Sequence, residues 1–401
     1  MKEAVSDNTE PFPRRSTPRS ALYVLKIVAV NLLILLVLGE LVSIILVHRR
    51  TWPSSRPNYH VNHTQFWVDM NPSFGTWHPS NSHFLHQGGC FSVEYTTNSY
   101  GARDVERSVH SAKPRTLVIG DSTIEGFGVP LEDRLSNILE KRTGREHLNF
   151  ATSSGFGPLQ YALLYKTMAS NFDHNVVMVG ILPDNDFHDM NLDYWKQHGK
   201  GNVYRPYYAD DFSIFYTGHF RPHPAEKTWD RIEDFMRAYL ASYHVVQFLY
   251  TRFYWMSAHD YFRPYSGYND YSDVDLARLK RALLDIKSTA DAHHARTAIF
   301  LIPRAVDFKR FHDKGENRLG PVMEAWGREA GIPIKDLLPG MDARSGGNDQ
   351  SFYLPCDGHW SRHGGEVAAD VLLPWLDYEP QISAGTATDL GAAVRRHERA
   401  P

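Results

Sequence analysis

The chain has 401 residues, and its 43 Lys and Arg nearly balance its 46 Asp and Glu, for a net charge of −3. With 42% hydrophobic residues it can bury a core, which excludes wholesale disorder, and the near-neutral charge argues against a nucleic-acid binder. Two cysteines exclude a disulfide-rich scaffold and a four-cysteine zinc site.

One very apolar segment lies near the N-terminus, at residues 27–47. As a helix it would be about 30 Å long, which matches the hydrocarbon core of a bilayer. It is too long for a typical signal peptide, and the residues that follow it, His48, Arg49 and Arg50, form no cleavage site. We therefore expect a single transmembrane helix that stays attached, with a buried core helix as the alternative.

Basic residues on the two sides of this segment predict its orientation. Five lie before it and three after it: Lys2, Arg14, Arg15, Arg19 and Lys26, then Arg49, Arg50 and Arg56. The positive-inside rule then makes residues 1–26 a cytoplasmic tail and places the body on the extracytoplasmic, periplasmic side of the inner (cell) membrane. Glu40 within the span predicts either a contact with a partner helix or a protonated side chain.

The rest of the chain divides by composition. Residues 48–112 are rich in Pro, Asn, His and aromatics, and we expect an irregular lead-in with a few short strands. Residues 113–378 alternate apolar, β-branched runs with helical patterns, which predicts parallel strands in a three-layer α/β fold. The expected strands cover 116–119, 147–150, 176–179, 298–302 and 331–334, and expected helices cover 135–142 and 276–286. Residues 379–401 read as a poorly ordered tail.

A long insertion, residues 187–272, separates the third and fourth strands and holds 13 of the 21 tyrosines. Its apolar spacing over 232–243 predicts an amphipathic helix. This helix could pack its stripe on the core, or it could form an aromatic surface that stacks on sugar rings. Tyr207 and Tyr208 in this insertion are candidate substrate-binding residues, and the same two interpretations apply to Tyr204, Tyr265 and Tyr268.

A nucleophile and its base are expected from two separated motifs. Gly120-Asp121-Ser122-Thr123 directly follows the first strand, where α/β folds place ligands, so Ser122 is a candidate nucleophile. Near the C-terminus, Asp357 and His359 are two residues apart in a loop. His359 can accept the serine proton, and Asp357 can orient the imidazole.

Acyl transfer also needs hydrogen-bond donors for the oxyanion. The backbone N–H of Ser122 is one candidate. Gly155, in the turn after the second strand, is another, with Gly157 as its alternative. The side-chain amide of Asn185, after the third strand, is the last. These signals are weak singly, but they are strong in this order, with three of them at strand ends.

Together these four motifs resemble the SGNH hydrolases of the GDSL-like superfamily. Residues 97–104 also resemble the NSxGxRD lead-in of membrane-anchored bacterial members, and the sequence from Asp357 to Trp360 is similar to the DxHW motif of alginate-type O-acetyltransferases. The resemblance implies a flavodoxin-like sheet and ester hydrolysis or acyl transfer without metal or cofactor. It departs from the family at Pro183, where a glycine is usual, and Trp360 is either a substrate contact or a packing residue under the histidine.

The sequence thus predicts a membrane-anchored serine esterase acting on acyl, chiefly O-acetyl, esters of an extracytoplasmic glycan or lipid. Two alternatives stay open: an O-acyltransferase that modifies a cell-surface polysaccharide and takes acyl groups from a membrane acyl-donor protein, and an inactive glycan-binding relative. Export permits a disulfide between Cys90 and Cys356, the alternative being two separate buried thiols.

Overall fold

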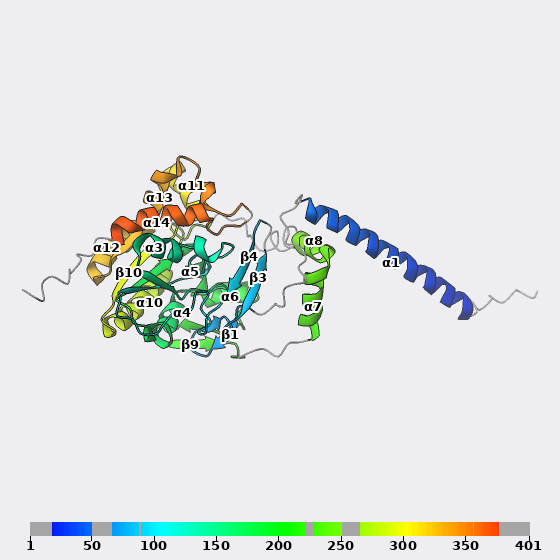
Figure 1. Ribbon diagram of the computed structural model, residues 1–401, viewed down its shortest axis with the longest axis horizontal. Helices are drawn as coiled ribbons and strands as arrows, with labels where there is room; N and C mark the ends of the chain where they lie inside the picture. The colour runs from blue at the N-terminus through cyan, green and yellow to red at the C-terminus, as the bar shows by residue number, and fades with distance from the viewer. Residues whose placement is uncertain are drawn as a thin grey trace, which may run out of the picture.

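A five-stranded parallel sheet organises the computed structural model of this chain (Figure 1), which describes residues 18–49, 66–87, 90–221, 228–250, 265–355 and 357–376. The strand order is β11-β10-β7-β5-β6. Numbered along the chain from β5, this is the 2-1-3-4-5 order of flavodoxin-like sheets. The predicted fold class is therefore confirmed. The strands are β5 (Arg115–Ile119), β6 (Glu146–Asn149), β7 (Val176–Ile181), β10 (Arg296–Leu301) and β11 (Ile334–Asp336).

Four of these strands overlap the ranges predicted from the sequence, and the fifth is displaced. We expected a strand over 331–334, but β11 begins only at Ile334. Gly331 adopts a left-handed conformation, with φ of 66°, and ends helix α12 (Leu319–Ala330). The strand therefore starts three residues later than its apolar pattern predicts, because Gly331 caps the preceding helix.

Helices cover both faces of the sheet (Figure 1). Helices α3 (Leu135–Thr143) and α14 (Arg362–Leu376) pack together on one face, and α4 (Pro158–Thr167) and α10 (Asp273–Ala292) pack together on the other. Every residue of β5 and β7 is buried, as expected for central strands with apolar runs. Shorter helices complete the body: α2 (Ser122–Glu125), α5 (Pro183–Asp189), α6 (Leu192–Gln197), α11 (Ala305–Lys314) and α13 (Leu338–Ser345).

The lead-in forms two antiparallel hairpins. The first pairs β1 (Val68–Asn71) with β2 (Gly75–Trp77), and the second pairs β3 (His83–Gln87) with β4 (Ser92–Thr96). Cys90, in the turn between β3 and β4, is disulfide-bonded. The other cysteine of the chain, Cys356, lies outside the described residues, so the Cys90–Cys356 pairing stays a prediction.

The insertion contains a hairpin and two helices. Strands β8 (Arg205–Tyr208) and β9 (Ile214–Thr217) pair, and α7 (Thr228–Tyr239) is followed by α8 (Ala241–Leu249). The single helix predicted over 232–243 is broken at Leu240, whose backbone is extended. Its stripe does not pack on the core either, because Ile232, Phe235 and Tyr239 are 43%, 58% and 57% exposed. The core-packing interpretation is therefore wrong.

Helix α1 (Pro18–His48) leaves the body as one long element (Figure 1). Its segment Ala21–His48 is long and apolar enough to cross a membrane. Most of its apolar side chains are exposed, which does not fit a buried core helix. Of the cytoplasmic tail expected over 1–26, residues 18–26 belong to α1, and residues 1–17 and the tail expected over 379–401 lie outside the described residues.

Candidate active site

The candidate nucleophile lies at the carboxyl end of β5. Gly120 and Asp121 follow the strand, and Ser122 is the first residue of α2. The turn is tight, because a side chain at Gly120 would put its Cβ 2.5 Å from Cγ1 of Ile124. The Asp121 carboxylate caps α2 by accepting a 2.9 Å hydrogen bond from the Thr123 N–H. The Ser122 hydroxyl is thereby presented at the top of the sheet, where strand order reverses between β5 and β7.

Ser122, His359 and Asp357 lie in one hydrogen-bonded relay. The Ser122 Oγ is 2.7 Å from His359 Nε2, although the two residues are 237 positions apart. On the other side of the ring, His359 Nδ1 contacts the Asp357 carboxylate, which also accepts the His359 backbone N–H at 3.0 Å. With Nδ1–H donating to the carboxylate, Nε2 is left to accept the serine proton. The structure therefore brings together the three residues predicted as nucleophile, base and orienting acid.

Two local features hold the histidine in place. The Phe127 ring stacks on the imidazole, with centroids 4.1 Å apart and planes 22° from parallel. The loop closes on itself, since Leu354 N–H donates to the His359 carbonyl at 2.9 Å and Asp357 N–H to the Leu354 carbonyl at 3.1 Å. Burial raises the pKa of the Asp357 carboxyl, but the hydrogen bond and charge of His359 outweigh burial and leave that pKa below its ordinary value. Asp357 is thus ionised at neutral pH.

The two glycines considered as oxyanion donors lie in different surroundings. The Gly157 N–H already donates to Gln160 Oε1 at 3.3 Å, where it starts α4. Gly155 has a φ of 67°, and a Cβ on it would lie 2.8 Å from the Trp195 ring. Glycine is therefore required there by both conformation and space. Its carbonyl accepts a hydrogen bond from Arg205, which fixes the orientation of the turn.

Asn185 lies on α5, at the carboxyl end of β7. Its Nδ2 donates to the Asp121 carboxylate at 3.2 Å, and the amide carries a second N–H that can serve a ligand. Pro183, which departs from the family pattern, is the first residue of α5. Proline suits that position because its missing N–H would be unpaired there in any residue. The departure therefore leaves Asn185 beside the nucleophile turn.

A buried carboxylate beneath the relay was not predicted. Glu125 is fully buried at the end of α2 and accepts hydrogen bonds from Trp67 Nε1 at 3.1 Å and from the Ser153 hydroxyl, with His78 Nε2 3.2 Å away. Burial raises the pKa of Glu125, but the contacts with His78 and Arg103 outweigh it and lower that pKa. The network ties the lead-in to the nucleophile helix and to the Gly155 turn. Its only sequence signal was an acid three residues after Ser122.

Arg103, from the NSxGxRD-like segment, fastens the turn that follows α2. Its buried guanidinium donates to the carbonyls of Glu125 at 2.6 Å, Gly126 at 2.8 Å and Val129 at 2.7 Å. The same group lies 3.5 Å above the centroid of the Tyr95 ring. The role of this segment is therefore to fix the chain on either side of Phe127, the residue that stacks on His359.

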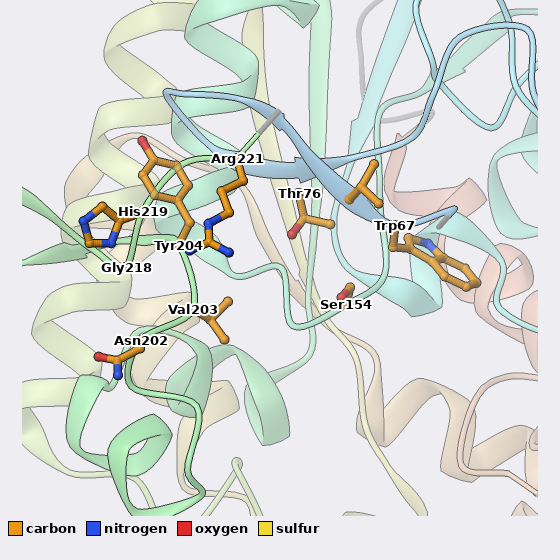
Figure 2. A pocket seen from close by; sticks show the side chains of 10 residues that line it. Trp67, Thr76, Ser154, Asn202, Val203, Tyr204, Gly218, His219 and Arg221 are labelled. Atoms are coloured by element: carbon orange, nitrogen blue, oxygen red, sulfur yellow. The ribbon is translucent and has the colours of Figure 1, made fainter. Parts of the chain in front are cut away.

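A cavity of about 730 Å³ opens beside these elements (Figure 2). Figure 2 shows Trp67 and Ser154 toward one end and Tyr204, His219 and Arg221 toward the other. The first end lies near the relay, because the centroids of the Trp67 and Phe127 rings are 6.5 Å apart and Phe127 stacks on His359. The remaining lining residues are Val68, Thr76, Asn202, Val203 and Gly218.

The three residues proposed as substrate contacts are all buried, and their contact with substrate stays a prediction. Tyr207, Tyr208 and Trp360 are 2%, 3% and 5% exposed. The Tyr208 hydroxyl donates to Asp285 at 2.8 Å, and Trp360 belongs to the main hydrophobic core. Tyr207 and Tyr208 line a smaller cavity of about 290 Å³, and the relay residues line neither this cavity nor the larger one. Tyr204, considered with them, lines the larger cavity instead.

Comparison with known proteins gives similarity to solved structures alone. No protein-family model and no curated protein matches the chain. A member of the lipolytic protein G-D-S-L family from Veillonella parvula is 10% identical over 65% of this chain and 96% of its own, with a TM-score of 0.35.

Two further structures are similar at the same level. A GDSL-like lipase from Bacteroides thetaiotaomicron is 10% identical over 68% of this chain and 92% of its own, with a TM-score of 0.35. A carbohydrate esterase family 2 enzyme with a carbohydrate-binding domain from Myceliophthora fergusii is 12% identical over 68% of each chain, with a TM-score of 0.37.

Proposed function

We propose that the chain is a serine esterase of the SGNH type that removes acyl groups, chiefly O-acetyl, from a glycan or lipid. The observation that carries the proposal is the relay in which Ser122 Oγ lies 2.7 Å from His359 Nε2 and His359 Nδ1 contacts Asp357. A hydroxyl, a neutral imidazole and an ionised carboxylate in this order make an activated serine nucleophile.

The first half of the reaction forms an acyl-enzyme. The Ser122 oxygen attacks the ester carbonyl as His359 Nε2 takes the serine proton, and Asp357 stabilises the imidazolium that results. The carbonyl oxygen becomes an oxyanion held by the N–H groups of Ser122 and Gly155 and the Asn185 amide. His359 then gives the proton to the departing alkoxide, so that the alcohol leaves and the acyl group stays on Ser122.

The second half regenerates the enzyme and decides between two functions. If His359 activates water, the acid is released and the protein is an esterase. If a sugar hydroxyl takes the place of water, the same steps make it an O-acyltransferase of a cell-surface polysaccharide. The cavity lined by Ser154 supports the transferase as a second candidate function. Its volume of about 730 Å³ is within the usual range of small-molecule sites and leaves room for an acceptor sugar.

The proposed location follows from α1. We place residues 1–26 in the cytoplasm, residues 27–47 of α1 across the inner membrane, and the catalytic body on the extracytoplasmic side, because more basic residues precede the span than follow it. The substrate would then be an ester of an extracytoplasmic glycan or lipid. A membrane protein that supplies acyl groups is the partner that the transferase function would need.

The test is release of acid from a chromogenic acetyl ester by the purified full chain in detergent. Ser122→Ala should lower turnover about 10³-fold or more, because the nucleophile is lost. Ser213→Ala, in the exposed turn before β9, is the matched control and should keep full activity. A wild-type chain with no activity on any acyl ester would leave the inactive glycan-binding alternative. Transfer of the acyl group to an added glycan, at the expense of acid release, would establish the transferase.

A further inference from the structure

The acidic residue inside α1 has a partner within the same chain. The two carboxylate oxygens of Glu40 accept hydrogen bonds from the backbone N–H groups of Ala241, at 2.7 Å, and Ser242, at 3.1 Å. These are the first two residues of α8, whose N–H groups have no partner inside their own helix. A negative charge at a helix N-terminus is also favoured by the helix dipole. Glu40 therefore attaches α8 to the apolar helix.

Apolar packing extends this attachment toward the end of α1. Ser43 and Val47 are buried, and with Glu40 they follow the i, i+3, i+7 spacing of one helix face. Val47 packs with Ala241 and Val245 of α8. In the apolar run 27–47, which spans about 30 Å, the thickness of the hydrocarbon core, Glu40, Ser43 and Val47 lie in the last two turns, so this contact falls toward the outer end of the span. Helix α8 would then lie in the interfacial region of the bilayer.

Helix α7 carries an apolar face that the body leaves uncovered. Trp229, Ile232, Phe235 and Tyr239 follow helical spacing, and Trp229 is the most exposed of them, at 64%. Polar contacts join this helix to α8: the Tyr243 hydroxyl donates to Glu233 at 2.9 Å, and His244 Nε2 donates to the Arg237 carbonyl at 2.8 Å. The two helices thus form one unit, with tryptophan and other large apolar side chains facing outward.

The placement of α7 fits a membrane surface. In Figure 1, α7 lies at an oblique angle to α1, on the side of the body from which α1 departs. The helix is thus on the side of the body that would face the bilayer. Amphipathic helices with Trp, Phe and Ile on one face bury that face at the headgroup boundary.

We propose that α7 and α8 form a membrane-surface unit, whose occupant is the lipid of the outer leaflet and whose contact face is Trp229, Ile232, Phe235 and Tyr239. The inference rests on the proposed anchoring by α1. The unit holds the body against the bilayer at a second place. Arg221, which lines the large cavity, precedes α7 by seven residues, so at most about 25 Å of extended chain separates that end of the cavity from the unit.

The test uses spin-labelled variants of the full chain in nanodiscs that hold one copy each, with the unsubstituted chain as background. Phe235→Cys probes the proposed face. Leu36→Cys, exposed in the middle of α1, is the reference for a label in the bilayer. Val322→Cys, exposed on α12, is the reference for a label in water. Accessibility to oxygen, which concentrates in lipid, is compared with accessibility to a water-soluble nickel chelate. We expect the Phe235 label, like the Leu36 label, to be accessible to oxygen and protected from the nickel chelate.

Each other outcome overturns the proposal in a distinguishable way. A Phe235 label as accessible to nickel as the Val322 label, with Leu36 in lipid, rejects the membrane-surface unit and leaves the anchor. A Phe235 label protected from both reagents shows a protein occupant instead. A Leu36 label in water rejects the anchor itself. Trp229→Cys repeats the measurement on the same face if Phe235→Cys fails to fold.

Discussion

The side-chain amide of Asn185 donates a hydrogen bond to the carboxylate of Asp121 at 3.2 Å, between the turns that follow β7 and β5. These are the two strands at which the strand order of the sheet reverses. The same carboxylate caps α2 through the Thr123 N–H. The buried Asp121 therefore caps the helix that begins with Ser122 and also binds the Asn185 amide. These two contacts hold the turns after β5 and β7 in a fixed position relative to each other.

Removing that donor should slow the chemical step. Asn185→Ala is expected to lower kcat about 10²- to 10³-fold, because a donor aimed at the oxyanion acts only when the negative charge develops. The KM for a chromogenic acetyl ester should change much less. Steady-state kinetics together with a thermal melt would check this. A variant that loses activity only through a higher KM would show that Asn185 binds substrate and does not hold the oxyanion.

Asp357→Asn should inactivate the relay without disturbing the fold. An amide in place of the carboxylate can donate to Nδ1, which would leave the proton on Nε2 and prevent His359 from accepting the serine proton. By analogy with other serine triads, kcat should fall about 10⁴-fold. Asp349→Asn, eight residues earlier, is the control and should keep wild-type kinetics. Retention of a tenth or more of the wild-type kcat in Asp357→Asn would assign the orienting role to another group.

Arg103→Lys tests whether the lead-in positions the catalytic residues. The guanidinium reaches three carbonyls around Gly126, whereas a lysine ammonium lacks the planar fork that this geometry needs. We expect a lower melting temperature and a kcat reduced by an order of magnitude or so, since loss of even one charge-assisted hydrogen bond costs about 1.5–3 kcal/mol.

The matched control for that variant is Arg107→Lys. Arg107 also lies in the lead-in and pairs with Asp104 at 3.1 Å and Glu140 at 2.8 Å, away from the nucleophile turn. It should lower stability while leaving kcat close to wild type. Equal effects of the two substitutions on kcat would mean that the lead-in contributes stability alone.

The parts of this structure that sequence predicts well are those encoded in short local patterns. The central strands are continuous apolar runs, and Ser122, Asn185 and the Asp357–His359 pair each stand beside such an element or in a marked loop. Proline at 183 shows the limit of pattern matching: it differs from the family motif, yet it suits the first position of α5.

The rest depends on contacts between distant segments. Tyr207 and Tyr208 could not be assigned from sequence, because a tyrosine in a strand has the same local signature whether it faces substrate or the core. The buried position of Glu125 could not be predicted, because its partners His78 and Ser153 lie 47 and 28 residues away in the sequence. The apolar spacing correctly predicts that α7 is amphipathic. Periodicity alone, however, does not say whether the core, a sugar or lipid covers the apolar face.

A last prediction concerns the dependence of stability on pH. Asp307 is buried at the start of α11, where it accepts hydrogen bonds from the Ser266 hydroxyl at 2.6 Å and the Arg304 N–H at 2.7 Å. Burial raises the pKa of Asp307 to about 7, with the charge of Asp184 adding to the effect and the two hydrogen bonds opposing it. In the unfolded chain the same carboxyl has a pKa of about 4.

Between about pH 4 and pH 7 the folded protein therefore binds a proton that the unfolded chain has lost. Stability should fall as pH rises through this window, by up to about 1.4 kcal/mol per pH unit from this group. Asp307→Asn, which cannot titrate, should flatten the decline of melting temperature between pH 5 and pH 7, even if the lost acceptor for the Arg304 N–H lowers stability at every pH. Asp313→Asn is the control on the same helix: the pKa of that exposed carboxyl is lowered by Lys309, so it is ionised throughout the window and its removal should leave the slope unchanged. An unchanged slope in Asp307→Asn would assign the pH dependence to other buried carboxyls, first among them Asp189, whose pKa burial raises to about 6.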